Sequence, residues 1–323
     1  MSTSRRRAPE RAGARAAAAL AAALAIPALA AGPALGAEGA SSHYLPGATG
    51  DLLLAVPPSP GLVVANTLWV QSGSVGRAVL GGQARVGLDL DLVLDLAAGA
   101  YTFETPVLGA TWTVAALVPF GRADLSASAV GPAGGRIDRS GDRFDLSDAA
   151  FVPVQLNWNF GEISLELSET IIAPTGGYSR GRAINLGRNY WSFDTAAAIT
   201  WFDPAAGREI SIAPGLMLNT ENEATDYRTG AEFHVDFTAN QFLSETFALG
   251  LRGYWYQQVE GDSGAGARLG DFRSSSLGLG LGFLWSPAAA GGRLSLMGKW
   301  MHDVEARNRF DSDYVSFTAA WTF

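Results

Sequence analysis

Cysteine is absent from all 323 residues, so the chain has no disulfides and no thiolate that could bind a metal or attack a substrate. Beyond the first 37 residues no run of 18 apolar residues occurs, which argues against a membrane-spanning helix there. Positive charge is also scarce, because this part of the chain holds 18 basic and 30 acidic residues. Without a basic stripe to meet phosphates, we expect neither nucleic acid nor an anionic lipid surface as a docking partner.

Residues 1–37 differ from the rest of the chain. Five arginines precede an Ala/Leu-rich run from about Ala16 to Ala31, and small residues follow. A basic region, an apolar region and small residues in this order are typical of a secretory signal peptide. We expect its cleavage site between Ala30 and Ala37 and leave this segment out of the fold prediction. A retained membrane anchor is the alternative.

The remaining sequence repeats an alternation of large apolar and small or polar residues. In its last eleven residues, Val315, Phe317, Trp321 and Phe323 share one face, which is the period of a β-strand. We count twelve such runs, most of them long enough to cross a bilayer when tilted. They lie near 61–72, 85–97, 107–121, 151–160, 162–173, 190–202, 208–219, 231–240, 247–259, 272–285, 292–304 and 313–323.

Connections of two lengths join these runs. Links after odd-numbered runs are long, such as 122–150, and most links after even-numbered runs are short, such as 203–207. Long loops at one rim and tight turns at the other are typical of outer-membrane barrels. An even number of strands also places both ends of the barrel segment at the short-turn rim.

A soluble β-sandwich is the competing fold, since it also has short alternating strands. Two features favour the barrel. Charged and amide side chains occupy the less apolar face of several runs, and we expect that face to line the lumen. Examples are Asp89, Asp91 and Asp95. Tryptophan and phenylalanine gather at strand ends, as in aromatic girdles at membrane interfaces. The sequence therefore predicts an all-β, antiparallel, up-and-down transmembrane barrel of about 12 strands over residues 61–323, in the outer membrane.

The C-terminal run would then be the last strand, with one face toward lipid and its edge paired with the first strand. Its aromatic end, with Phe317, Trp321 and Phe323 at alternate positions, resembles the signal that the outer-membrane assembly machinery reads. Lipid and that machinery are the partners we expect besides a substrate.

A set of polar and tyrosine side chains is predicted to face the lumen and form the substrate channel. These residues are Asp194, Glu232, His234, Asp236, Arg252, Tyr254, Tyr256 and Lys299. A barrel of twelve strands is wide enough for a narrow passage. Residues 38–60 are too few for a domain and too apolar for a free tail, so we expect a short periplasmic or plug-like segment inside the barrel.

Other motifs carry little chemistry. The glycines of "GLGLGF" (278–283) fall on the inward face of a strand, and "GDSGAGARLGDF" (261–272) has the wrong spacing for a dinucleotide-binding turn. The oxygen-rich loop 219–230 lacks the EF-hand spacing for calcium. His234 beside two carboxylates could act as a base, but no serine can be assigned to it. We therefore predict no catalytic residue, cofactor or metal.

Several strings in the chain resemble one known family. They are "SHYLPG" (42–47), "VPPSPG" (56–61), "NLGRNYWSFD" (185–194), "NTENEATDYRTGAEFHVDF" (219–237) and "GYWYQQVEGDSGAGARLGDF" (253–272). Together they resemble the outer-membrane family linked to a meta-pathway of phenol degradation. The resemblance covers nearly all of the chain after the signal and implies a β-barrel that passes aromatic or other hydrophobic compounds inward. It brings no catalytic residues.

The function predicted from these observations is passive uptake of small hydrophobic, including aromatic, compounds through an outer-membrane channel. The first alternative is a structural or surface-interaction barrel with a closed lumen, whose long loops contact something outside. The second is a lipid-modifying enzyme that uses His234.

Overall fold

The computed structural model describes residues 37–47, 51–79, 84–130, 135–267 and 273–323. Except for Ala37, the expected signal peptide lies outside the described residues, as does part of the loop 261–272. The described chain contains two 3-10 helices of three residues each, η1 (Glu38–Ala40) and η2 (Ala288–Ala290). Neither of these described helices is long and apolar enough to cross a membrane.

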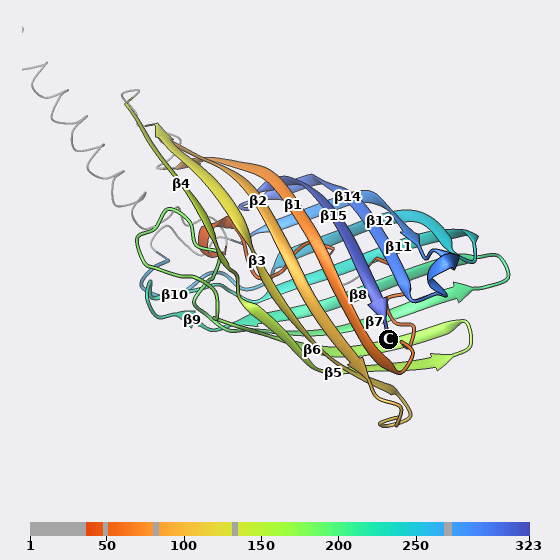
Figure 1. The fold of residues 1–323 in the computed structure, drawn as a ribbon. Helices are drawn as coiled ribbons and strands as arrows, with labels where there is room; N and C mark the ends of the chain where they lie inside the picture. Colours follow the sequence, from red (N-terminus) through yellow and green to blue (C-terminus); the bar gives the residue numbers. More distant parts are fainter. Residues whose placement is uncertain (1–36, 48–50, 80–83, 131–134, 268–272) are drawn as a thin grey trace, which may run out of the picture.

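Within the described residues, twelve antiparallel strands close into a barrel (Figure 1). In order around the wall they are β1 (Gly61–Val79), β2 (Ala84–Thr102), β3 (Thr111–Val130), β5 (Ala149–Phe160), β6 (Ile163–Ala173), β7 (Ser192–Asp203), β8 (Arg208–Asn219), β11 (Glu232–Ser244), β12 (Phe247–Gln258), β13 (Ser275–Trp285), β14 (Leu294–Arg307) and β15 (Asp311–Thr322). The first and last strands pair from Val63–Thr322 to Ser74–Asp311, which closes the sheet. The predicted up-and-down barrel is confirmed, with the C-terminal run as its last strand.

The prediction of a loop over 122–150 is wrong for most of its length. β3 continues to Val130, and a further strand, β4 (Arg136–Leu146), pairs with its upper part. The lower part of β3 pairs with β5 instead, so β3 changes partner along its length. In Figure 1 the β3–β4 hairpin projects beyond the barrel at the long-loop end. The period-two signal is weak there because both faces of the hairpin carry small or charged residues in place of a lipid-facing apolar row.

The loop 219–230 is also partly ordered into strands. β9 (Glu221–Asn222) pairs with β10 (Tyr227–Arg228) to form a small hairpin at the long-loop end. Among the described residues, no group of three or more His, Cys, Asp or Glu side chains is arranged to hold a metal ion.

The outward face of the barrel wall is apolar in its central band. On β15 Val315 and Phe317 are close to half exposed, and Leu279 and Leu281 on β13 are similarly exposed. Since these residues alternate with buried ones along each strand, they form the surface that lipid covers. The aromatic residues expected to signal assembly, Phe317, Trp321 and Phe323, lie on this outward surface, while the signalling role itself stays a prediction.

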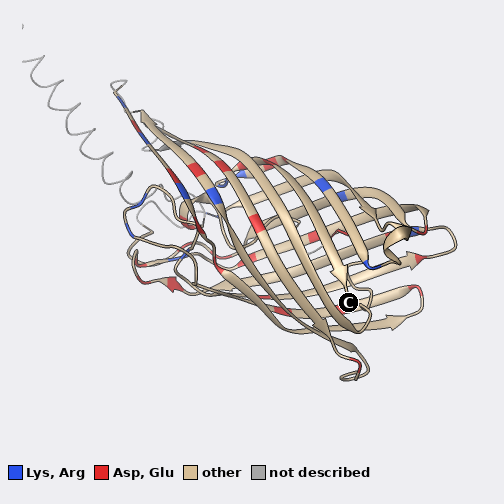
Figure 2. Ribbon diagram, in the orientation of Figure 1, with Lys and Arg blue, Asp and Glu red and all other residues tan. Residues whose placement is uncertain are grey.

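On β2 the prediction about which face lines the lumen is wrong. Its leucines, Leu88, Leu90 and Leu94 among them, are buried inside the barrel, whereas Asp89 and Asp91 are exposed. Figure 2 shows charged residues along β2–β4, where these strands rise past their neighbours. A strand face that extends beyond the lipid meets water, so charge is favourable there and the apolar residues turn inward.

The third acid of that set also faces outward. Asp95 lies lower on β2 and is bonded by the side chain of Asn66 from β1 at 2.5 Å. The amide supplies the donor that lipid lacks, which reduces the cost of a carboxylate on this face.

The inward glycines of β13 are confirmed, but they do not leave empty space. A Cβ on Gly278 would lie 2.2 Å from the ring of Tyr254, and one on Gly280 would lie 1.9 Å from the backbone oxygen of Trp300. The strand carries glycine because the side chain of Tyr254 and the neighbouring backbone of β14 already occupy these positions.

Candidate functional site

The side chains predicted to line the channel all point into the barrel. Seven come from the inward faces of β7, β11 and β12, and Lys299 comes from β14. Glu232, His234, Asp236, Arg252, Tyr254 and Tyr256 are each at most 2% exposed. Asp194 bonds His234 Nε2 at 3.0 Å. In this structure they contact each other and the N-terminal segment, residues 37–60, so their role as a substrate channel stays a prediction.

The N-terminal segment follows the inner wall from the long-loop rim to the short-turn rim. Near its start, the Glu38 carboxylate accepts hydrogen bonds from the side chains of Asn222 and Thr225 at the long-loop end. Near its end, the backbone N–H of Ala55 donates to Thr200 Oγ1 on β7 at 2.9 Å. The chain then enters β1 at Gly61. The described parts of the segment therefore contact the inside of the barrel near both rims, and a plug function stays a prediction.

A cluster of rings holds the middle of the segment. The Tyr44 ring stacks on His234 with centroids 4.4 Å apart and on Tyr256 at 5.6 Å, and it meets the edge of Tyr254 at 6.2 Å. Its hydroxyl donates to Asp236 Oδ1 at 2.8 Å. Burial raises the pKa of Tyr44 well above its usual value, and the neighbouring Asp236 raises it further, so the hydroxyl remains a donor.

Cations fix the segment below this cluster. The Nζ of Lys299 donates to the backbone oxygen of Gly47 at 2.5 Å and lies 2.7 Å from Asp51 Oδ1. Arg252 lies 4.0 Å from the same carboxylate oxygen. These contacts use two of the predicted channel residues to neutralise a carboxylate that the segment brings into the lumen.

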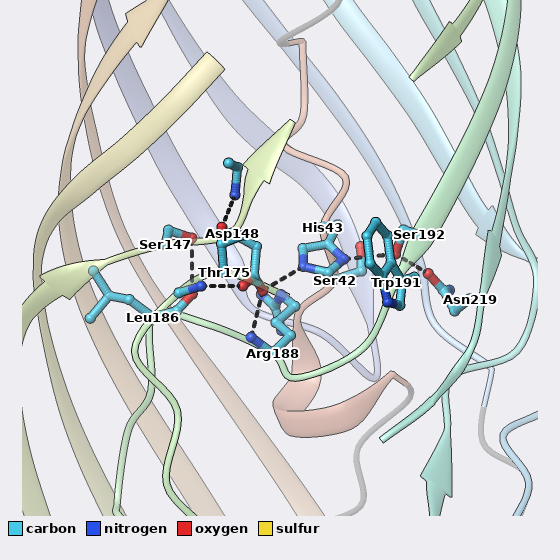
Figure 3. Close-up of polar contacts among 12 residues, drawn as sticks. Ser42, His43, Ser147, Asp148, Thr175, Leu186, Arg188, Trp191, Ser192 and Asn219 are labelled. Atoms are coloured by element: carbon cyan, nitrogen blue, oxygen red, sulfur yellow. Dashed lines mark hydrogen bonds and ion pairs between the residues drawn. The ribbon is translucent and has the colours of Figure 1, made fainter. Parts of the chain in front are cut away.

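His43 joins the segment to two parts of the wall (Figure 3). Its Nε2 lies 2.9 Å from Asp148 Oδ2, and its Nδ1 lies 2.7 Å from Ser192 Oγ. Asp148, which precedes β5, also accepts hydrogen bonds from the backbone N–H groups of Gly176 and Arg188. One buried carboxylate thus links the segment, β5 and the loop between β6 and β7.

The protonation of this pair follows from burial and bonding. Burial lowers the pKa of His43, and its bond to Asp148 opposes that change only in part. Burial alone would raise the pKa of Asp148, but its bond to His43 and its two backbone N–H bonds lower that pKa overall. The arrangement is therefore a neutral ring beside an ionised carboxylate.

The three side chains of Ser192, His43 and Asp148, bonded in that order, are those of a hydrolase triad, but their geometry does not suit catalysis. Ser192 is fully buried, and its hydroxyl also lies 2.5 Å from Asn219 Oδ1, which competes for the single hydrogen that a nucleophile passes to histidine. His234, the base considered from sequence, is enclosed by Tyr44 and Asp194. Both histidines serve as positioning groups for the N-terminal segment.

A cavity of about 560 Å³ lies in the lumen at the long-loop end. Leu90, Leu92 and Leu94 of β2 form one wall, and further apolar side chains come from β3. The N-terminal segment forms the opposite boundary, and the loop between β6 and β7 covers it from outside. The arrangement can hold an apolar molecule against leucine side chains, with polar groups on the facing side.

Sequence reasoning missed the residues of the N-terminal segment that bind the wall, and some of the residues that surround the segment. Tyr44 and His43 were visible as a polar and aromatic string in an otherwise small-residue stretch, yet nothing local indicated their partners. Asp148 and Arg309 lay in two of the links expected to be long loops, 122–150 and 305–312. Arg309 is 7% exposed, and its guanidinium stacks 4.2 Å from the Tyr256 ring centroid, which extends the ring cluster to the cavity.

The chain is similar to several solved structures. The COG4313 outer membrane channel from Pseudomonas putida F1 aligns with a TM-score of 0.65 and 16% identity, covering 83% of this chain and 98% of that one. The transport unit of the autotransporter AIDA-I from Escherichia coli gives a TM-score of 0.45 at 11% identity, covering 82% of this chain and 91% of that one. At 16% identity, the likeness to the first structure shows a shared fold alone, that of an outer-membrane barrel.

Comparison with curated protein sequences finds no match. A family model, by contrast, matches most of the chain: the one described as "Putative MetA-pathway of phenol degradation" aligns with residues 76–319. The match spans the barrel from the upper part of β1 into β15. Because this covers well over half of the sequence, the chain belongs to that phenol-degradation family of outer-membrane proteins.

Proposed function

We propose that this protein is a passive outer-membrane channel for small apolar compounds, aromatic ones included, and that its N-terminal segment gates the passage. The observation that carries the proposal is the leucine wall of β2. Leu90, Leu92 and Leu94 face a cavity of about 560 Å³ at the long-loop end, where a pore for hydrated solutes would carry polar groups. The family to which the chain belongs and the channel with a similar fold support the same function.

The expected strength of binding suits passive transport. Burying roughly 150 Å² of an aromatic ring against such a wall yields about 4 kcal/mol at ~25 cal/mol per Å². Association costs at least about 4 kcal/mol in lost translational and rotational freedom. The two terms nearly cancel, so an apolar molecule would bind weakly and leave again. A channel without an energy source requires this, because tight binding would stop the flux.

The contacts of the N-terminal segment favour the second candidate, a barrel whose lumen stays closed. The described residues of the segment make hydrogen bonds to the rest of the barrel near both rims and between them, through Glu38, Tyr44 and Ala55 among others. For the channel proposal, these contacts must rearrange or leave a path beside the segment. For a surface-interaction barrel, they would be permanent.

Solute flux into liposomes holding the refolded protein tests the proposal. Phenol and a sugar of similar size are compared for the full barrel and for a variant lacking residues 38–60, with protein-free liposomes setting the background. We expect phenol flux above background in the full barrel and loss of selectivity in the deletion variant. Flux at background in both would support the closed barrel instead.

A point variant tests the leucine wall itself. Leu92→Asn places an amide in the cavity and should lower phenol flux, because the apolar wall loses one of its three central side chains. Ser72→Asn is the matched control, since Ser72 is exposed on β1 close to Leu92 in register but on the opposite face. Equal loss of flux in both variants would contradict the role of the wall.

A further inference from the structure

Ala37 is buried at the long-loop end of the lumen. It is 1% exposed, and its backbone nitrogen lies 3.1 Å from Asp262 Oδ2. The next residue is also fixed, because Glu38 N–H donates to Thr229 Oγ1 at 3.2 Å. The described N-terminal segment is therefore fixed to the wall at Ala37 and Glu38.

Asp262 is a buried carboxylate whose described hydrogen-bond partners include no cation. It is 5% exposed and accepts hydrogen bonds from Tyr227 Oη, Gly230 N–H, Gln258 Nε2 and Ala37 N. Burial raises the pKa of Asp262, and these hydrogen bonds offset the change only in part. A buried carboxylate held by neutral donors alone would gain most from a positive charge.

The backbone of Ala37 is unusual for an internal residue. Its φ is 57° and its ψ is 149°, a combination confined essentially to glycine because Cβ meets the preceding carbonyl group. If Ala37 were the first residue of the chain, there would be no preceding carbonyl and no such clash. The conformation that is strained in an uncut chain is therefore unstrained in a chain that begins at Ala37.

The sequence before Ala37 is compatible with a cut at this position. Signal peptidase requires small residues at the first and third positions before the cleaved bond, and Gly36 and Ala34 occupy them. A cut one residue later would place Leu35 at the third position, which is less suitable. The cut at Ala30 is equally acceptable by this rule but would leave Ala37 inside the chain.

We propose that signal peptidase cleaves between Gly36 and Ala37, and that the α-ammonium group released on Ala37 forms a buried ion pair with Asp262. Water adds across the peptide bond, leaving a carboxylate on Gly36 and an amino group on Ala37 that takes up a proton at neutral pH. The α-ammonium group of Ala37 then stands where the amide N–H stood in the uncut chain. Asp262 thereby gains a positively charged partner, which its neutral donors do not provide.

This ion pair fixes the outer end of the N-terminal segment, as strand β1 fixes its inner end. The signal peptide must be removed before the pair forms, so processing comes before the final packing of the lumen. The assignment does not depend on what the lumen carries, and a barrel with a closed lumen would use the same contact.

The first test measures the mass of the protein after its signal peptide has been removed in cells. The full chain is expressed with its own signal in a Gram-negative host, purified from the outer membrane and analysed by intact mass spectrometry and N-terminal sequencing. We expect a chain that starts at Ala37. A chain that starts at Ala31, Glu38 or any other residue would overturn the proposal, whatever the behaviour of variants.

The second test measures the reactivity of the α-amino group. An amine-reactive label at pH 7.5 should modify the N-terminus of the wild type at least about tenfold more slowly than that of Asp262→Asn, because an ammonium paired with a carboxylate stays protonated. Glu260→Gln is the matched control, since Glu260 is an exposed acid two residues away that pairs with Arg228. Equal labelling of the wild type and Asp262→Asn, with the correct N-terminus, would refute the ion pair.

Discussion

Replacing Tyr44 tests how the N-terminal segment is held, because this residue belongs to the segment and leaves the barrel wall unchanged. In Tyr44→Phe the hydrogen bond to Asp236 is lost, which costs about 1.5–3 kcal/mol for a bond to a charged acceptor. In Tyr44→Ala the stacking on His234 and Tyr256 is lost as well, and removing a buried aromatic side chain costs about 3–5 kcal/mol.

These energies convert into populations of a released segment. At about 1.4 kcal/mol per factor of ten, Tyr44→Phe should raise the released population at least about tenfold. The same conversion gives an increase of at least about a hundredfold for Tyr44→Ala. The order of the two variants follows from the structure, since Phe keeps the rings in contact and Ala does not.

The assay uses the absence of cysteine from the chain. A single Ser42→Cys reporter is buried in the segment, and its rate of reaction with a thiol reagent follows the released population when the segment recloses faster than the thiol reacts. A Ser72→Cys reporter on the exposed face of β1 is the control and should react equally in all variants. If Tyr44→Ala leaves the Ser42→Cys rate within about threefold of the parent, the ring cluster does not hold the segment.

Three further predictions concern the pH response, the glycines and the C-terminus. Because burial lowers the pKa of His43, the folded state binds fewer protons there than the unfolded state. The stability that this site contributes is therefore complete above the usual histidine pKa of 6.5 and is lost as the pH falls below it. Ion conductance should therefore rise on acidification to pH 5. A His43→Gln variant should lose this response. Gly280→Ala should prevent folding, since its Cβ would lie 1.9 Å from a backbone oxygen, whereas Gly99→Ala meets nothing within 4 Å and should fold normally; heat-modifiable mobility in gel electrophoresis distinguishes them. Deleting Phe323 should reduce the amount of barrel assembled in cells while purified protein still refolds in detergent, and equal assembly with and without it would exclude the signalling role.

Much of the barrel could be predicted because lipid acts on each strand locally. The runs that end in Phe160, Asn219 and Trp285 alternate strictly, and the structure ends β5, β8 and β13 at these residues. The prediction was weaker where strands leave the lipid. Residues of β4 contact water on one side and the loop between β6 and β7 on the other, so their sequence lacks an apolar row. The same reason explains β2, whose alternation was visible but whose inward face was assigned wrongly.

The sequence alone determined that this chain forms a closed antiparallel barrel with twelve wall strands, because backbone hydrogen bonding in lipid and a period of two allow few other structures. Only the tertiary structure decided what fills the lumen. Tyr44 meets Asp236 across 192 positions, and His43 meets Asp148 across 105. No local pattern encodes such pairs, because their geometry depends on the register of strands that are far apart in the chain. The side of β2 that faces inward and the position of Ala37 beside Asp262 depend on the same long-range packing.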